Sequence, residues 1–189
     1  MKNLPKNTAL LLIDIQKGLD EHDFYGGNRN NPQAEENAAK ILRYWRKRGQ
    51  PIFHVRHSSQ NPRSPLHASK SGFDIKEEVK PLENEPLFTK NVNSAFIGTD
   101  LEDVLKDNGI NNIVMVGLTT NHCISTSVRM AANLGFETVL VSDACAAFDQ
   151  MGINGKPFDA ELIHQTALAS LKDEFAQILS TAKLLEKMH

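Results

Sequence analysis

Three side chains of this 189-residue sequence could together carry out nucleophilic chemistry: Asp14, Lys90 and Cys123. Each lies at or just beyond the end of an apolar, strand-length segment, and Cys123 is close to the start of a predicted helix. Free N–H groups at a helix N-terminus and a neighbouring ammonium both favour the thiolate, which is the attacking form of cysteine. Asp14 could accept the thiol proton, return it to a leaving amine and then activate a water molecule. These residue types therefore predict catalysis through a covalent thioester.

Structural interpretations of the same residues remain open at this point. A free cysteine is more often a small buried residue than a nucleophile, so Cys123 alone would be weak evidence. A buried carboxylate needs a partner, and Asp14 with Lys90 could form a purely structural ion pair. Cys145 has no matching base and is interpreted as structural.

The elements that must position these residues alternate between strands and helices. The pattern predicts an α/β fold with a doubly wound parallel sheet, in one domain that spans residues 1–189. Ligands of such sheets bind at the carboxyl ends of the strands, where all three candidate residues lie. The segment 58–86 is rich in Ser, Asn, Pro, His and Glu and is predicted to be an active-site loop. Strands are expected at 8–15, 51–57, 87–90, 112–118, 136–141 and 175–179, and helices at 34–48, 100–108, 121–134, 159–172 and after Ser180.

Composition argues against several classes of partner and cofactor. The 21 Lys and Arg residues against 23 Asp and Glu leave a net charge of −2, so a nucleic-acid partner is not expected. The longest apolar run, residues 9–15, is too short to span a membrane, and no signal-peptide cleavage pattern follows it. Two cysteines without a CxxC pair predict a reducing, cytoplasmic location. Neither GxGxxG nor GxxxxGK[ST] occurs, so nucleotide binding is not indicated.

Three stretches give the chain a family resemblance. Residues 11–16 (LLIDIQ), 90–96 (KNVNSAF) and 117–123 (GLTTNHC), with 180–182 (STA) as a minor match, resemble the isochorismatase-like cysteine hydrolase superfamily, which includes nicotinamidases and carbamoylsarcosine amidases. The resemblance implies a six-stranded parallel sheet flanked by helices and a triad of Asp14, Lys90 and Cys123. It also implies a cis peptide between Leu118 and Thr119, and an oxyanion hole made by the N–H groups of Thr119 and Cys123.

The resemblance further narrows the expected chemistry. Isochorismatases that cleave a vinyl ether do without the cysteine, so Cys123 favours cofactor-free hydrolysis of a small amide, lactam or imide. The nicotinamidase metal site begins with Asp-x-His, whereas the aligned residues here are Val55 and His57. His54 and His57 point to opposite faces of a strand, and His67 lies in the long loop, so we expect no metal ion.

Two alternatives remain at the level of function: a vinyl-ether hydrolase in which Asp14 is the general acid, and a non-catalytic ligand- or partner-binding protein. Family members are dimers or tetramers, so a homo-oligomer is expected. Specificity in the family lies in loops such as 58–86, so the substrate itself is not predicted beyond a small molecule. The residues predicted to contact it are Gln16, Phe24, His57, Phe96, Leu118 and Phe148.

Overall fold

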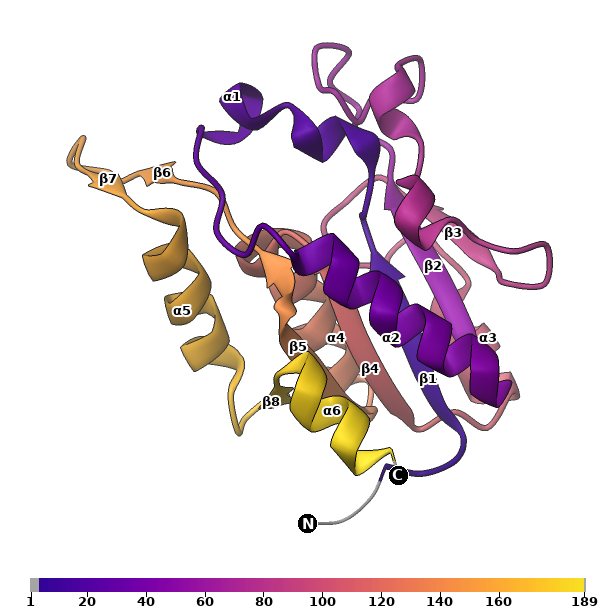
Figure 1. Cartoon of the computed structure of the whole chain (residues 1–189). Coiled ribbons are helices and arrows are strands. Elements are labelled where there is room, and N and C mark those ends of the chain that lie inside the picture. The colour runs from indigo at the N-terminus through magenta and orange to yellow at the C-terminus, as the bar shows by residue number, and fades with distance from the viewer. Residues whose placement is uncertain (1–3, 189) are drawn as a thin grey trace.

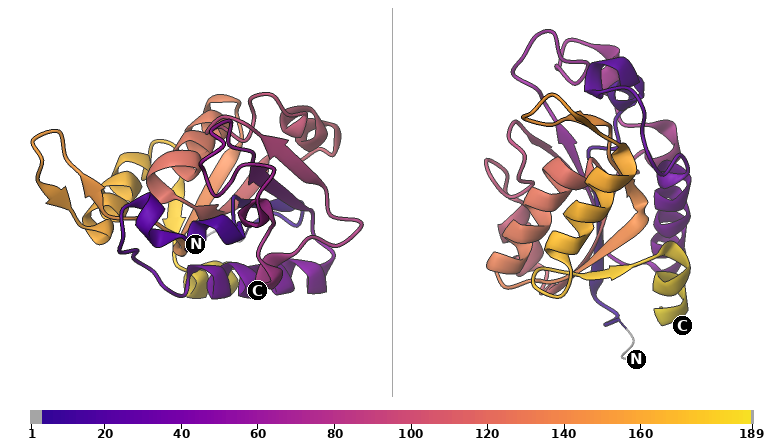
Figure 2. Two further views of the ribbon diagram at one scale, coloured as in Figure 1. Left: turned by 90° about the horizontal axis from the view of Figure 1, so that it is seen from above. Right: turned by 90° about the vertical axis from the view of Figure 1, so that its left-hand side faces the viewer.

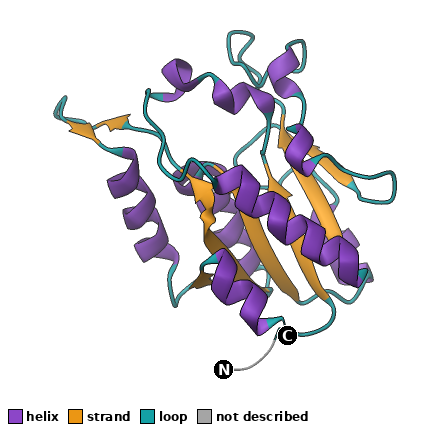
Figure 3. Ribbon diagram, in the orientation of Figure 1, coloured by secondary structure: helices purple, strands orange, loops and turns teal. Residues whose placement is uncertain are grey.

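The computed structural model describes residues 4–188, and within them a six-stranded parallel sheet forms the centre of the molecule (Figure 1, Figure 3). The strand order is β3-β2-β1-β4-β5-β8. The strands are β1 (Thr8–Ile13), β2 (Ile52–His57), β3 (Leu87–Lys90), β4 (Asn112–Leu118), β5 (Glu137–Ala146) and β8 (Gln177–Leu179). The α-helices are α1 (His22–Tyr25), α2 (Ala34–Arg48), α3 (Leu101–Asp107), α4 (Ser125–Asn133), α5 (Ala160–Leu171) and α6 (Thr181–Lys187).

The helices cover both faces of the sheet, which explains why its central strands are apolar throughout. Helices α2 and α6 pack on one face, and α3, α4 and α5 lie on the other, as the side view in Figure 2 shows. Strand β1 supplies both cores because its side chains alternate: Leu10 and Leu12 pack with α2, whereas Leu11 and Ile13 pack towards α3 and α4. The predicted α/β fold with a six-stranded parallel sheet is confirmed.

Helix ends follow the local sequence. Gly49 ends α2 in a left-handed conformation, with a φ of 62°. The side chain of Asp159 accepts a hydrogen bond from the Leu162 N–H at the start of α5. The Ser180 hydroxyl caps α6 in the same way by accepting from the Lys183 N–H, as the sequence predicts.

The order in which the strands are added to the sheet reverses between β1 and β4. From β1 it moves outward to β2 and β3, and it then returns to the other side of β1 to form β4. Ile13 pairs with Gly117 at this position, so the residues that follow β1 and β4 leave the sheet side by side. The divergence of the two connections creates the crevice in which such sheets bind ligands.

Several elements differ from the sequence prediction. Strand β1 ends at Ile13 because Asp14 has a φ of 54°, and β5 continues to Ala146. A hairpin of β6 (Gln150–Met151) and β7 (Pro157–Phe158), which was not predicted, projects away from the sheet just before α5 begins (Figure 1). The long segment after β2, which the sequence predicts as a loop, contains the 3-10 turns η2 (Ser71–Phe73) and η3 (Glu77–Val79). No helix in the described part of the chain is long and apolar enough to span a membrane.

Candidate active site

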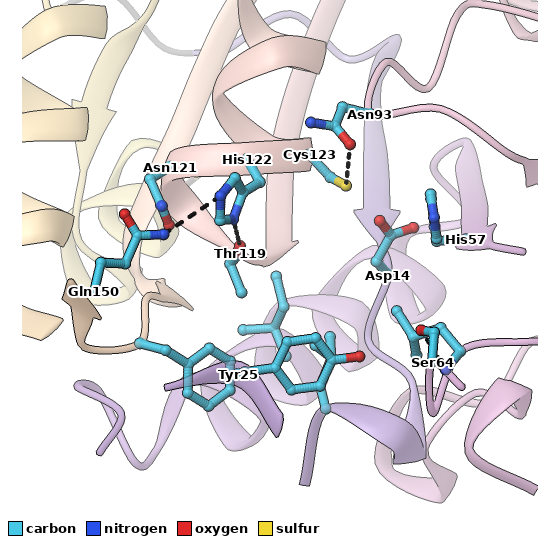
Figure 4. Close-up of a pocket in the computed structure, with 14 residues that line it drawn as sticks. Asp14, Tyr25, His57, Ser64, Asn93, Thr119, Asn121, His122, Cys123 and Gln150 are labelled. Atoms are coloured by element: carbon cyan, nitrogen blue, oxygen red, sulfur yellow. Dashed lines mark hydrogen bonds between the residues drawn. The ribbon is translucent and has the colours of Figure 1, made fainter. Parts of the chain in front are cut away.

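Asp14 leaves the sheet at the crevice between β1 and β4. Its positive φ, a conformation that Asp tolerates better than most residues, turns the chain directly after the strand. Its N–H donates to the carbonyl of Val55 on the neighbouring strand, over 2.9 Å. The carboxylate is 2% exposed and faces Cys123 and His57 (Figure 4).

Lys90, the last residue of β3, brings the candidate residues together. Its side chain is fully buried, and Nζ lies 2.6 Å from Asp14 Oδ2, 3.2 Å from Cys123 Sγ and 3.1 Å from His57 Nδ1. An ammonium has three N–H donors, and each of them has one acceptor here. The register explains the geometry, because Lys90 pairs with His57 and β2 lies directly beside β1.

Cys123 lies in a single π-helical turn, η4 (Thr120–Ile124), between β4 and α4. Such turns occur frequently at functional sites. The peptide bond between Leu118 and Thr119, just before this turn, is cis.

The surroundings of Cys123 favour the thiol over the thiolate that the sequence predicts. Burial raises the pKa of the thiol, the charge of Asp14 raises it further, and Lys90 only partly opposes them. The sequence reasoning weighed the helix end and the lysine, whereas burial depends on the folded surroundings of the thiol. This shift favours the protonated thiol, which needs a base before it can attack.

The second carboxylate oxygen of Asp14 is the base atom available to it. Oδ2 accepts from Lys90, whereas Oδ1 is buried and has no hydrogen-bond partner within residues 4–188. Potential ligand atoms of Asp14, His57 and Cys123 lie within 4.8 Å of one another. Oδ1 is therefore free to accept the proton of a nearby thiol.

The same three side chains form a set that could bind a metal ion. However, the Lys90 ammonium lies within hydrogen-bond distance of all three residues. A cation among them would have to displace this ammonium and overcome its repulsion. These three side chains therefore suit the Lys90 ammonium better than a metal ion.

A cavity of about 220 Å³ opens onto this cluster (Figure 4). Of the predicted residues, Asp14, Cys123, Thr119, His57, Leu118 and Phe148 line it. Eight further lining residues were not predicted: Leu19, Tyr25, Ser64, Leu66, Asn93, Asn121, His122 and Gln150.

Some of the missed residues carried a usable signal. Asn93 lies within the stretch 90–96, and Asn121 and His122 lie within 117–123, so they share the motifs that contain Lys90 and Cys123. The Asn93 Oδ1 atom is 3.9 Å from the Cys123 sulfur. Tyr25, Ser64 and Gln150 come from α1, the long loop and β6, and only the tertiary structure brings them to the cavity.

Three residues predicted to contact substrate do not line the cavity. Gln16 is fully buried, and its amide bonds to the backbone of His57 and Phe73. Phe24 is 49% exposed on α1, where it packs edge-on against Tyr25. Phe96 is buried in the core and stacks on Phe136 with ring centres 6.0 Å apart. The two phenylalanines therefore pack against other aromatic side chains, and the Gln16 amide holds backbone groups in place.

The other two histidines considered for a metal site lie apart from His57. His54 is buried on β2, and its Nε2 is 3.0 Å from Glu85 Oε2, which also binds Arg46. His67 Nδ1 contacts the hydroxyl of Ser69 in the exposed loop.

Comparison with known proteins identifies the family of this chain. A model of the isochorismatase domain matches residues 8–183. The chain belongs to the isochorismatase family. The isochorismatase-family protein YrdC of Bacillus subtilis is 48% identical over 182 residues, which cover 96% of each chain.

The relatives of this chain include a protein of solved structure and an enzyme with a named activity. A family protein from Chromobacterium violaceum, known from a crystal structure, is 38% identical in sequence. Its structure matches this one with a TM-score of 0.94, over 100% of this chain and 96% of that chain. The ureidoacrylate amidohydrolase RutB of Rhizobium rhizogenes is 36% identical over 137 residues, or 70% of this chain and 49% of that protein. The resemblance in the three sequence stretches is thus confirmed, and the chain is a hydrolase of the isochorismatase family.

Proposed function

We propose that this isochorismatase-family hydrolase cleaves a C–N bond of a small amide, lactam or imide through a thioester on Cys123, with Asp14, Lys90 and Cys123 as its catalytic triad. The observation that carries the proposal is the Lys90 ammonium, which lies 2.6 Å from Asp14 and 3.2 Å from Cys123 at the cavity. The amidohydrolase activity in the name of one relative belongs to the same reaction class.

The reaction begins with transfer of the thiol proton. Asp14 Oδ1 accepts it as Cys123 Sγ attacks the substrate carbonyl carbon, and the Lys90 ammonium stabilises the developing thiolate. The N–H groups of Thr119 and Cys123 are the proposed donors to the carbonyl oxygen as it becomes negative. Asp14 then returns the proton to the leaving nitrogen, the C–N bond breaks, and a thioester remains on Cys123.

The second half of the reaction releases the acid. Asp14 takes a proton from a water molecule that attacks the thioester carbonyl, and the thiolate leaves and is reprotonated by Asp14. The net change is hydrolysis of one C–N bond with no change in the protein. His57, held against Lys90, keeps the ammonium directed at the other two residues.

The test measures ammonia release from a panel of amides, ureido compounds, lactams and imides by wild type, Cys123→Ala and Cys145→Ala. Cys145 is a matched control because it is a buried cysteine outside the cavity. We expect Cys123→Ala to lose at least about 10³-fold in rate and Cys145→Ala to retain activity. Rapid quenching should also trap an acyl group on the peptide that contains Cys123.

Two other results would contradict the proposal. Ammonia release that persists in Cys123→Ala would remove the thiol from the mechanism, and cleavage of a vinyl ether by that variant would favour Asp14 as a general acid. A wild-type protein that binds panel members without forming an acyl adduct or releasing ammonia would favour a binding role.

A further inference from the structure

The cavity is almost free of formal charge, although it lies beside an ion pair. Asp14 is the sole acidic residue among the fourteen residues that line it, and neither lysine nor arginine is among them. Lys90 is fully buried behind the lining, and its three donors are already bonded to Asp14, His57 and Cys123. No cation in the lining is therefore available to pair with a charged ligand.

The two histidines in the lining do not supply that cation. Burial lowers the pKa of His57, and the charge of Lys90 lowers it further. Burial also lowers the pKa of His122, whose Nδ1 contacts the Thr119 hydroxyl at 3.0 Å. Both shifts favour the neutral form of the ring. The nearby Arg63 precedes Ser64 in the loop, but it is exposed and does not line the cavity.

The polar groups in the lining suit a neutral ligand instead. Asn121 Oδ1 and Tyr25 Oη are buried, and neither makes a hydrogen bond of acceptable geometry with the described residues. The Tyr25 ring is held in place by stacking on Phe148, with ring centres 5.3 Å apart, and its hydroxyl lies beside Ser64 (Figure 4). Buried polar atoms without partners are costly, so a ligand that bonds to both is favoured.

The size of the cavity sets a second limit. Its volume of about 220 Å³ lies below the roughly 300–1,000 Å³ of pockets that take drug-sized ligands. Four apolar side chains complete its walls: Leu19, Leu66, Leu118 and Phe148.

We propose that the substrate is a compact, uncharged carboxamide, lactam or imide without a carboxylate, and that the Tyr25 hydroxyl and the Asn121 amide hold its polar edge. This inference rests on the proposed hydrolysis at Cys123. A carboxylate in the cavity would face Asp14 with no free cation, and an unpaired buried ion is strongly disfavoured. Ureidoacrylate, the compound in the name of the relative RutB, carries such a carboxylate. The proposed substrate of this chain therefore differs in charge from the compound that RutB is named after.

The test compares two alkylating reagents of nearly equal size, neutral iodoacetamide and anionic iodoacetate. Each transfers its two-carbon group to the sulfur of Cys123 with loss of iodide, and mass spectrometry of the Cys123 peptide measures the rate. Glutathione provides the intrinsic ratio of the two rates. We expect the iodoacetamide to iodoacetate ratio for Cys123 to exceed the glutathione ratio by at least about tenfold.

Variants assign the effect to the lining. Tyr25→Phe and Asn121→Ala should slow the reaction of Cys123 with iodoacetamide several-fold more than its reaction with iodoacetate. Arg63→Ala should leave both rates unchanged, because Arg63 does not line the cavity. A Cys123 ratio equal to or below that of glutathione, a loss of both rates in Arg63→Ala, or no alkylation by either reagent would overturn the inference.

Alkylation requires the thiol and the cavity but no hydrolysis. Failure of the charge selection can therefore be distinguished from failure of the proposed function. A high iodoacetamide to iodoacetate ratio together with ammonia release that does not depend on Cys123 would refute the thioester mechanism. It would still support the selection of uncharged ligands by the cavity.

Discussion

The Nδ1 atom of His57 lies 3.1 Å from the ammonium of Lys90, so this ring nitrogen must accept a hydrogen bond. An ammonium can only donate, and Nδ1 can accept only while it is unprotonated. Burial and the charge of Lys90 both lower the pKa of His57, while Asp14 and the Val92 backbone partly oppose them. His57 thus works as a neutral support for Lys90.

The first prediction concerns the pH dependence of activity. Because the pKa of His57 is below its usual 6.5, the ring stays neutral at pH 7 and becomes charged only as the pH falls below 6.5. The added proton would direct a second positive charge at Lys90, so kcat/KM should fall on the acid side. His57→Gln keeps an acceptor that does not titrate and should reduce this acid limb, whereas His67→Gln in the exposed loop should retain it. An unchanged acid limb in His57→Gln would contradict the assignment.

The second prediction concerns the buried pair of Asp14 and Lys90, whose side chains are 2% and 0% exposed. Asp14→Ala leaves the ammonium buried without a counter-ion and should lower the free energy of unfolding by about 3–5 kcal/mol. The double variant Asp14→Ala with Lys90→Met removes both charges and should recover much of this loss. Urea unfolding measures the stabilities, and neither variant should hydrolyse substrate. Strictly additive losses would contradict a direct interaction.

The third prediction concerns Gln16, which supports β2 and the long loop rather than the substrate. Its side chain donates to the carbonyls of His57 and Phe73 and accepts from the His57 N–H over 2.7 Å. Gln16→Ala leaves these backbone groups without partners, so we expect a loss of about 1–3 kcal/mol in unfolding free energy. The exposed Gln177→Ala is the control and should be near neutral. A Gln16→Ala variant that keeps full stability and shows only a raised KM would favour direct substrate contact.

The fourth prediction concerns Gly117, which has a φ of 138° at the end of β4. A Cβ atom there would lie 1.9 Å from the Ile13 carbonyl oxygen, so the backbone directly before Asp14 would have to move. Gly135, with a φ of 91°, has nothing within 4 Å of its Cβ position and is the matched control. Gly135→Ala should cost about 1–2 kcal/mol from backbone conformation alone. Gly117→Ala should cost clearly more in thermal unfolding and lose activity, and equal costs would contradict the close approach.

The regular elements could be read from the sequence because local physics dominates them. The apolar stripe of α2 and the glycine after it predict Ala34–Arg48, the bounds that the structure has. The apolar segment of β4 likewise predicts Asn112–Leu118. The end of β1 was missed by two residues, because the turn at Asp14 depends on its place between β2 and β4.

The cavity was predicted only in part, since periodicity cannot distinguish a pocket wall from a core wall. Phe148 and Phe96 are both buried aromatic residues, yet the first lines the cavity and the second stacks on Phe136. Tyr25 and Gln150 lie outside the recognisable motifs and come from α1 and the unpredicted hairpin. Their positions follow from long-range packing.

The sequence by itself determined the α/β fold, the family, and the residues Asp14, Lys90 and Cys123 at one edge of the sheet. These follow from hydrophobic periodicity and from short motifs, both of which are local. Only the tertiary structure decided that the surroundings of Cys123 raise the pKa of its thiol, that Lys90 is bonded to three acceptors, and that no cation lines the cavity. Burial and charge pairing depend on every element that surrounds a group, and those elements come together only when the chain folds.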